Sequence, residues 1–253
     1  MKAVREAVIL AAGEGSRLKP CLKDMPKFLL KILGKPLISY PLTTLINMGV
    51  EKIVVVVPKG WGKVLNQIVE SFDAEFKVVE NQHVERENGY SFLLSEKYVE
   101  EDLFFLSMCD HIYPTKLIRK LLKSIKKMSE AIMLVAGDKK PKYIDIHEAT
   151  KIKCIKDKVI KIGKRILDYN YIDSGVFLVK KTFYEVAREL AKIKRVIKLS
   201  DIINYAIEKD KIIRVANITG TAWTEIDTPK DLKELLYGKR RKVLKKVMKE
   251  RKR

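Results

Sequence analysis

The sequence has few cysteines and no long apolar run, and both absences narrow what the protein can be. Its three cysteines, Cys21, Cys109 and Cys154, lack metal-ligand spacing. So small and odd a set fits a reducing compartment better than a disulfide framework, which predicts a cytoplasmic protein. No apolar run approaches the roughly 20 residues of a membrane span. Residues 1–6 also lack the apolar stretch of a signal peptide.

Glutamine is equally scarce and occurs only as Gln67 and Gln82, whereas 33% of the residues are charged and lysine dominates. This pattern is typical of hyperthermophilic proteins. The chain has 253 residues, 47% of them hydrophobic, which suffices for one large domain with a substantial core.

Strand-like and helix-like runs alternate along the chain. The alternation predicts a single α/β domain with a mostly parallel central sheet and helices on both faces. The expected strands are 7–11, 52–57, 76–79, 103–107, 131–136, 175–179 and 211–217, and the expected helices are 37–49, 61–72, 90–99, 114–128, 181–192 and a last one from Thr228-Pro229 onward. Residues 150–162 alternate apolar and polar around Lys156-Asp157, which predicts a β-hairpin insertion.

The net charge is +20, and much of it lies in a C-terminal tail, residues 238–253, which we separate from a main domain at 1–237. This tail carries ten Lys or Arg and one Glu, a net +9. Apolar pairs such as Val243/Leu244 and Val247/Met248 suit one face of a helix. The favoured interpretation is a helix packed on the domain; the alternative is a basic amphipathic anchor on anionic lipid or on a partner. Nucleic acid is not expected, because no aromatics interleave the basic run.

A hydrophobic strand opens into the run LAAGEGSRLKPCLKDMPK, from Leu10 to Lys27. Its glycines free consecutive backbone N–H groups to wrap a phosphate chain, and the arginine and final lysine add two cations. The spacing matches neither a P-loop nor a Rossmann dinucleotide fingerprint. An ordinary strand-to-helix turn is the alternative. The candidate nucleotide-binding residues are Leu10, Ala11, Ala12, Gly13, Glu14, Gly15, Ser16, Arg17 and Lys27.

Two aspartates are candidates for holding Mg²⁺. Asp110 follows the strand 103–107, and ligands of parallel sheets gather beyond the carboxyl ends of strands. Asp227 lies in Trp223-Thr-Glu-Ile-Asp227, where a helix cap is the alternative role because Thr-Pro follows. We expect His111 to line the site or to cap a turn rather than to bind metal.

The Gly-x-Gly-x-Arg run with its Pro-Lys pair resembles the signature of nucleotidyltransferases that make nucleoside-diphosphate sugars and polyols. The resemblance implies a Rossmann-like fold, with Asp110 and Asp227 as the two metal carboxylates and Arg17 and Lys27 as catalytic cations. It also places Asn88 and Ser91 near the nucleoside, Asp173 and Ser174 near the hydroxyl groups of the acceptor, and Lys164, or alternatively Lys161, on the acceptor phosphate.

A narrower resemblance covers about residues 7–236. The runs 143–151, 162–164 and 171–175 are similar to those of inositol-1-phosphate cytidylyltransferases of hyperthermophiles, and they add Asp145 and Glu148 as acceptor-binding candidates. In many such organisms this module is fused to a membrane-bound synthase, so the tail could contact a membrane or such a synthase. The resemblance implies that CTP and inositol 1-phosphate give CDP-inositol and pyrophosphate, for the synthesis of the compatible solute di-myo-inositol phosphate.

The implied chemistry needs no covalent residue, because the acceptor phosphate is itself an anionic nucleophile. Two alternatives stay open. One is a nucleotidyltransferase for a sugar phosphate or for phosphocholine, whose ammonium group Trp61, Trp223 or Tyr90 could surround. The other is a nucleotide-binding module recruited to membranes by its tail. If the protein is an enzyme, we expect a truncation near Tyr237 to stay active. The sequence does not indicate the oligomeric state.

Overall fold

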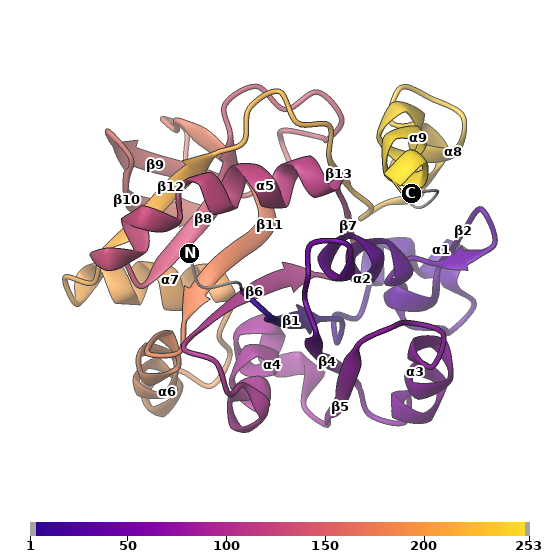
Figure 1. The fold of residues 1–253 in the computed structure, drawn as a ribbon, viewed down its shortest axis with the longest axis horizontal. Helices are drawn as coiled ribbons and strands as arrows, with labels where there is room; N and C mark the ends of the chain where they lie inside the picture. The colour runs from indigo at the N-terminus through magenta and orange to yellow at the C-terminus, as the bar shows by residue number, and fades with distance from the viewer. Residues whose placement is uncertain (1–3, 251–253) are drawn as a thin grey trace.

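A nine-stranded sheet runs through the middle of the protein (Figure 1). The structure is a computed structural model and describes residues 4–250. Its strands lie in the order β5-β4-β1-β6-β11-β8-β12-β10-β9. Their bounds are β1 Glu6–Leu10, β4 Lys52–Pro58, β5 Glu75–Asn81, β6 Leu103–Met108, β8 Met133–Asp138, β9 Lys151–Ile155, β10 Lys158–Gly163, β11 Tyr171–Lys180 and β12 Ile213–Asn217. All the strands expected from the sequence are present, and the hairpin forms as β9 and β10.

The expected α/β fold is confirmed, and the sheet is mixed: seven of its nine strands run in one direction, and β11 and β10 run in the other. Strands β5, β4, β1 and β6 pair in parallel, as do β8 and β12. β11 lies between β6 and β8 and is antiparallel to both. The sequence of β11 does not reveal this direction, because its buried residues 176–179 are apolar, as in a strand buried on both faces whichever way it runs.

Both faces of the sheet are covered by helices. Alternate residues of β1 point to opposite sides: Ala7 and Ile9 enter one core cluster, and Val8 and Leu10 enter the other. The first cluster packs under α2 (Ser39–Ile46), α3 (Gly62–Val69) and α5 (Thr115–Lys123). The second packs under α4 (Glu87–Ser95), α6 (Phe183–Ile193) and α7 (Leu199–Glu208).

The sequence analysis missed α7 and several short elements. Leu199, Ile202, Ile203 and Ala206 are buried at helical spacing, which is the signal that could have predicted α7. The short elements are α1 (Lys19–Leu22), β2 (Lys31–Ile32), β3 (Lys35–Pro36), β7 (His111–Ile112) and β13 (Thr224–Glu225). β13 pairs with β7, so two segments far apart in sequence lie side by side at the end of β6.

Two helices close the described chain. α8 (Pro229–Leu236) begins at Thr228, whose hydroxyl accepts the N–H of Asp231 at 3.2 Å. α9 (Arg241–Glu250) buries Val243, Leu244 and Val247 in a third core cluster. Residues 251–253 of the expected tail lie outside the described residues. None of the helices in residues 4–250 is long and apolar enough to cross a membrane.

Candidate active site

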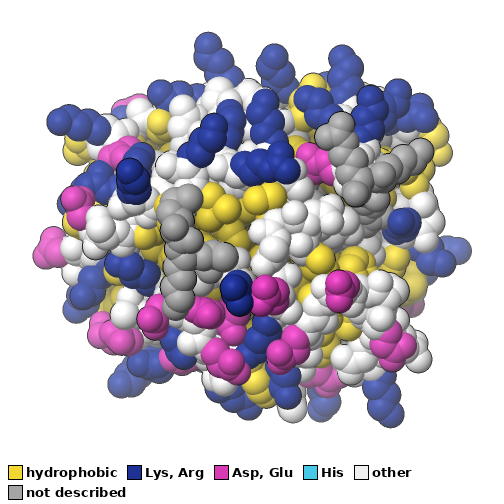
Figure 2. Space-filling view, viewed as in Figure 1, with side chains coloured by type: hydrophobic (Ala, Val, Ile, Leu, Met, Phe, Trp, Pro, Cys, Tyr) yellow, Lys and Arg dark blue, Asp and Glu magenta, His cyan; other side chains and the backbone are white. Residues whose placement is uncertain are grey.

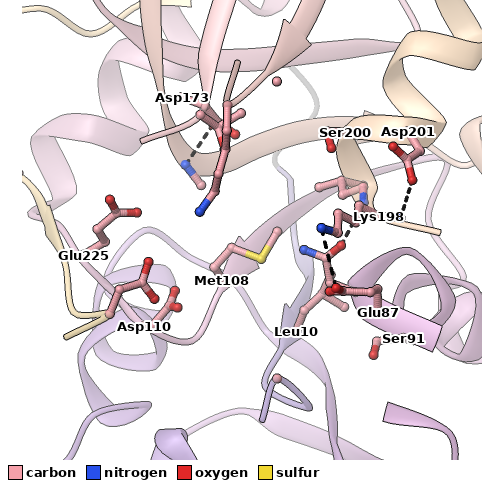
Figure 3. Close-up of a pocket in the computed structure, with 18 of the residues that line it drawn as sticks. Leu10, Glu87, Ser91, Met108, Asp110, Asp173, Lys198, Ser200, Asp201 and Glu225 are labelled. Atoms are coloured by element: carbon pink, nitrogen blue, oxygen red, sulfur yellow. Dashed lines mark hydrogen bonds and ion pairs between the residues drawn. The ribbon is translucent and has the colours of Figure 1, made fainter. Parts of the chain in front are cut away.

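A cleft of about 1070 Å³ opens beyond the carboxyl ends of β1 and β6. The loop after β1 forms one wall, and the end of the hairpin, the start of α4 and the start of α7 form the others. Figure 3 shows Asp110 and Glu225 together on one side and Glu87, Lys198 and Asp201 on the other. The cleft therefore joins a carboxylate-rich end to a polar end built by two helices.

Gly15 lets the loop after β1 pass close to Lys27. Its φ of +61° lies in the left-handed region, which side chains disfavour. A Cβ at this position would lie 3.0 Å from the Cβ of Lys27 and 3.1 Å from the Cδ1 of Leu22. Loop and lysine are thus held against each other, and the expected residues Leu10, Ala12, Gly13, Glu14, Gly15, Ser16, Arg17 and Lys27 all line the cleft.

Five charged side chains form a network at the carboxylate-rich end. Lys27 is only 6% exposed, and its ammonium donates to both Asp110 and Asp227. The guanidinium of Arg17 donates to Asp227 at 2.9 Å and to Glu148 at 2.7 Å. The sequence places these residues up to 210 positions apart, and the fold brings them into contact.

The charges in this network stabilise one another. Burial alone would lower the pKa of the Lys27 ammonium, but Asp110 and Asp227 outweigh burial and raise it above its ordinary value. Burial alone would raise the pKa of Asp110, but Lys27 and His111 hold it well below its usual range. Lys27 is therefore a fixed cation at neutral pH, and Asp110 a fixed anion.

His111 lines the cleft, as expected, and bridges two carboxylates. Its Nδ1 lies 2.6 Å from Asp110 and its Nε2 lies 3.4 Å from Glu225. Burial alone would lower the pKa of His111, yet Asp110 and Glu225 raise it to about 10. Gly175 makes room for the ring, because a Cβ there would lie 2.6 Å from Nε2. The His111 imidazolium thus holds one oxygen of Asp110, and Lys27 holds the other.

The donor set at this end suits Mg²⁺. The carboxylates of Asp110 and Asp227 meet at the Lys27 ammonium, so they lie close together, and Mg²⁺ favours one or two carboxylates completed by phosphate oxygens and water. Residues 4–250 contain no group of three or more acidic, His or Cys side chains placed to hold a metal. The oxygens of a bound triphosphate would therefore have to complete the coordination.

Asn88 and Ser91, the expected nucleoside contacts, line the polar end. The Asn88 side-chain oxygen accepts the N–H of Leu199 at 2.8 Å, so it fastens α7 to α4. The Ser91 hydroxyl is buried and accepts from the amide of Asn81 at 3.0 Å. Both side chains use part of their hydrogen-bonding capacity within the protein.

The acceptor candidates divide into two groups. Lys164, Lys161, Glu148 and Asp173 line the cleft. Burial raises the pKa of Asp173 to about 7, although its carboxylate accepts the N–H of Gly175 at 2.9 Å. Asp173 thus changes charge near neutral pH.

Three expected residues do not line the cleft. The Ser174 hydroxyl is buried and donates to the carbonyl of Ala136 at 2.8 Å. Asp145 accepts the N–H of His147 at 3.1 Å and lies 3.8 Å from Lys230. Ala11 is buried, and its N–H donates to Val56. Strand alternation explains Ser174, because its neighbour Asp173 faces the cleft.

The sequence analysis missed several lining residues. Glu225 lies two positions before Asp227, and its pairing opposite His111 depends on the short β13–β7 ladder. Ser200, Asp201 and Asn204 come from α7, which was not predicted, and Lys198 caps its N-terminus. The helical spacing of the buried α7 residues is a signal in the sequence that predicts this helix, whose N-terminus lies at the cleft.

Comparisons with known proteins agree with this geometry. A family model described as "MobA-like NTP transferase domain" matches residues 7–198. Proteins described as "Bifunctional IPC transferase and DIPP synthase" are 32% identical over 231 residues in Aquifex aeolicus and 30% identical over 228 residues in Thermococcus kodakarensis. They match 91% and 90% of this chain, which spans about half of their length (51% and 49%).

A solved structure extends the likeness to the whole fold. The inositol-1-phosphate CTP transferase from T. maritima is 36% identical, with a TM-score of 0.88 over 97% of this chain and 96% of that chain.

Proposed function

The chain belongs to the family of MobA-like NTP transferase domains, and we propose that it is a cytidylyltransferase acting on CTP and inositol 1-phosphate. The products would be CDP-inositol and pyrophosphate. One observation carries the proposal: a glycine loop, two cations and two carboxylates line one cleft of this chain. The chain is 36% identical to a solved inositol-1-phosphate CTP transferase.

The reaction would be an in-line displacement. An oxygen of the acceptor phosphate forms a bond to the α-phosphorus of CTP, the bond from that phosphorus to the α–β bridging oxygen breaks, and pyrophosphate leaves with the electron pair. A phosphate monoester with a second pKa of about 6 is already a nucleophilic anion. The protein then has to position two repelling anions and stabilise the charge on the leaving group.

The cations have separate roles in this proposal. The N–H groups of residues 13–17 hold the β- and γ-phosphates, and Arg17 stabilises the leaving pyrophosphate. Lys27, fixed at the back of the loop, lies between the nucleotide and the acceptor phosphate. Arg17 already pairs with Glu148 and Asp227, and we expect a nucleotide phosphate to replace Glu148 as the partner of its Nη1.

Nucleotidyltransferases of this family generally use a divalent metal, and we propose Mg²⁺. Asp110 and Asp227 would hold it together with phosphate oxygens of the nucleotide. When bound, Mg²⁺ neutralises charge on the phosphates and polarises the phosphoryl group. Asp110 and Asp227 already pair with the Lys27 ammonium, so they would hold Mg²⁺ while also facing this lysine.

The acceptor would occupy the side of the cleft formed by the hairpin. Lys161 and Lys164 are exposed lining residues, and either could bind its phosphate. Asp173 and Glu148 would accept hydrogen bonds from inositol hydroxyl groups. Phosphocholine is disfavoured because Trp61, Trp223 and Tyr90 are not among the described residues that line the cleft. Trp223 is buried and donates its indole N–H to Asp138 at 3.0 Å.

The relatives that join an IPC transferase to a DIPP synthase suggest where the product goes. We propose that CDP-inositol is consumed by a DIPP synthase activity.

α9 buries its apolar face and exposes Arg241, Lys242, Lys245, Lys246 and Lys249, and Figure 2 shows basic side chains gathered on the side of the molecule that carries α9. Any contact with a membrane would therefore be electrostatic. An electrostatic contact predicts that the protein sediments with anionic liposomes at low salt and is released from them at high salt. Liposome binding that high salt leaves unchanged would contradict an electrostatic contact.

Product analysis tests the proposed function. Incubation with CTP, inositol 1-phosphate and Mg²⁺ should give CDP-inositol and pyrophosphate in equal amounts, as followed by ³¹P NMR. Asp110→Ala should lower turnover at least ~10²-fold, corresponding to about 2.7 kcal/mol. Release of inorganic phosphate instead of pyrophosphate would contradict the reaction, and normal turnover of folded Asp110→Ala would remove Asp110 from it.

A further inference from the structure

Arg240 is buried in the C-terminal segment, residues 238–250, although its neighbours are exposed. It lies between α8 and α9 with 3% exposure, whereas Lys239 and Arg241 face solvent. Its Nη2 lies 2.7 Å from Asp231, and both side chains are almost fully buried. Its Nη1 donates to the carbonyl of Glu225 at 2.9 Å and to the Thr224 hydroxyl at 3.3 Å. The guanidinium thus clamps α8 to β13.

The partner of Arg240 holds the segment that carries Asp227. One oxygen of Asp231 forms the ion pair with the Arg240 guanidinium, and the other accepts hydrogen bonds from the N–H groups of Asp227 at 3.0 Å and Thr228 at 2.9 Å. Without the arginine, the Asp231 carboxylate would be left buried and unpaired, a costly state that favours rearrangement. Asp227 would then lose the backbone anchor from which it reaches Lys27 and Arg17.

The rest of the segment is tied to the same end of the cleft. Val243, Leu244 and Val247 of α9 share the third core cluster with Leu18, which directly follows the glycine loop, and with Leu22 at the end of α1. The carboxylate of Glu250 accepts the N–H of Thr115, at the start of α5, at 2.8 Å. The C-terminal helix therefore packs behind the elements that present Arg17 and Asp227.

We propose that Arg240 is a positioning residue of the active site, acting through Asp231 to hold Asp227, and that the C-terminal segment is part of the scaffold of the site. This inference rests on the proposed function in one respect, the assignment of Asp227 to the metal. It reverses the expectation that a truncation near Tyr237 stays active, because that truncation removes Arg240 and all of α9.

The test compares Arg240→Met with Arg241→Met in the full chain. Each variant loses one positive charge, but only Arg240 contacts Asp231. Three quantities are measured: amide hydrogen exchange of residues 224–231, Mn²⁺ affinity in the presence of CTP by electron paramagnetic resonance, and kcat and KM. Arg240→Met should speed exchange of the Asp227 and Thr228 amides at least about tenfold, weaken Mn²⁺ binding at least about tenfold and lower kcat similarly, with KM for the acceptor within about threefold.

Arg241→Met should match the parent within about twofold in every quantity, and Arg240→Lys should recover part of the loss because it keeps a charge facing Asp231. Arg240→Met that exchanges, binds Mn²⁺ and turns over like the parent would overturn the inference. If Arg240→Met does not fold, Arg240→Gln, which also removes the charge facing Asp231, decides in the same way: faster exchange at residues 227–228 supports the inference, and parent-like exchange overturns it. Asp227→Asn with unchanged Mn²⁺ affinity would count against the proposed metal site, while the exchange data, which need no metal, still test Arg240.

Discussion

Replacing Lys27 with Met removes the one ammonium shared by Asp110 and Asp227 while keeping most of the side-chain volume. Removing one partner of a buried ion pair costs about 3–5 kcal/mol because an uncompensated charge remains. Both carboxylates keep 20% of their side-chain surface exposed, so water offsets part of this penalty. We expect Lys27→Met to lower the free energy of unfolding by about 3 kcal/mol. For a chain of this size the unfolding midpoint would fall by about 6–12 °C.

A divalent cation should restore much of this stability. Two carboxylates without their ammonium attract Mg²⁺ more strongly than a neutralised pair, and tenfold tighter binding adds about 1.4 kcal/mol at saturating Mg²⁺. The assay is thermal unfolding of parent and variant in EDTA and in excess Mg²⁺. Lys31→Met, at an exposed lysine, should change stability by less than about 0.5 kcal/mol in both conditions. A Lys27→Met variant as stable as the parent in EDTA, or an equal effect of Mg²⁺ on both proteins, would refute the reasoning.

Three further predictions concern the loop and the acceptor side. Arg17→Ala should lower kcat at least ~10²-fold in steady-state kinetics, with stability nearly unchanged because its side chain is 40% exposed; a kcat within about threefold of the parent would contradict its role. Gly15→Ala should lower turnover at least about tenfold more than Gly34→Ala, since both have positive φ but only at Gly15 would a methyl group meet Lys27; equal losses would contradict this. Burial raises the pKa of Asp173 to about 7, so the folded protein retains a proton that the unfolded chain releases, and the carboxyl opposes folding increasingly as pH rises towards 7. Asp173→Asn should therefore raise the urea midpoint more at about pH 8 than at about pH 5, and the opposite order would contradict the assignment.

The sequence predicts the sheet and most of its helices because their patterns are local. After Lys52, residues 53–57 are all apolar, which predicts a strand buried on both faces, and β4 is such a strand. The antiparallel direction of β11 is not local, because it depends on pairing with β6 and β8. The short ladder of β7 with β13 is equally non-local, since it joins residues more than a hundred positions apart.

The same distinction holds for the site. The glycine loop and Asp110 follow strands directly, so the rule for parallel sheets places them at one edge. Ser174 was expected beside Asp173, but alternation along β11 turns its hydroxyl toward Ala136. The roles of Arg240 and Glu225 depend on contacts between segments that come together only in the folded chain.

Pyrophosphate release tests the central claim most directly. CTP, UTP, dTTP, ATP and GTP would each be combined with inositol 1-phosphate, glucose 1-phosphate and phosphocholine in the presence of Mg²⁺, at about 80 °C because the composition is typical of hyperthermophiles. The account predicts release with CTP and inositol 1-phosphate at a rate far above that of every other pair. Efficient release with a different pair, or none with CTP and inositol 1-phosphate, would contradict it.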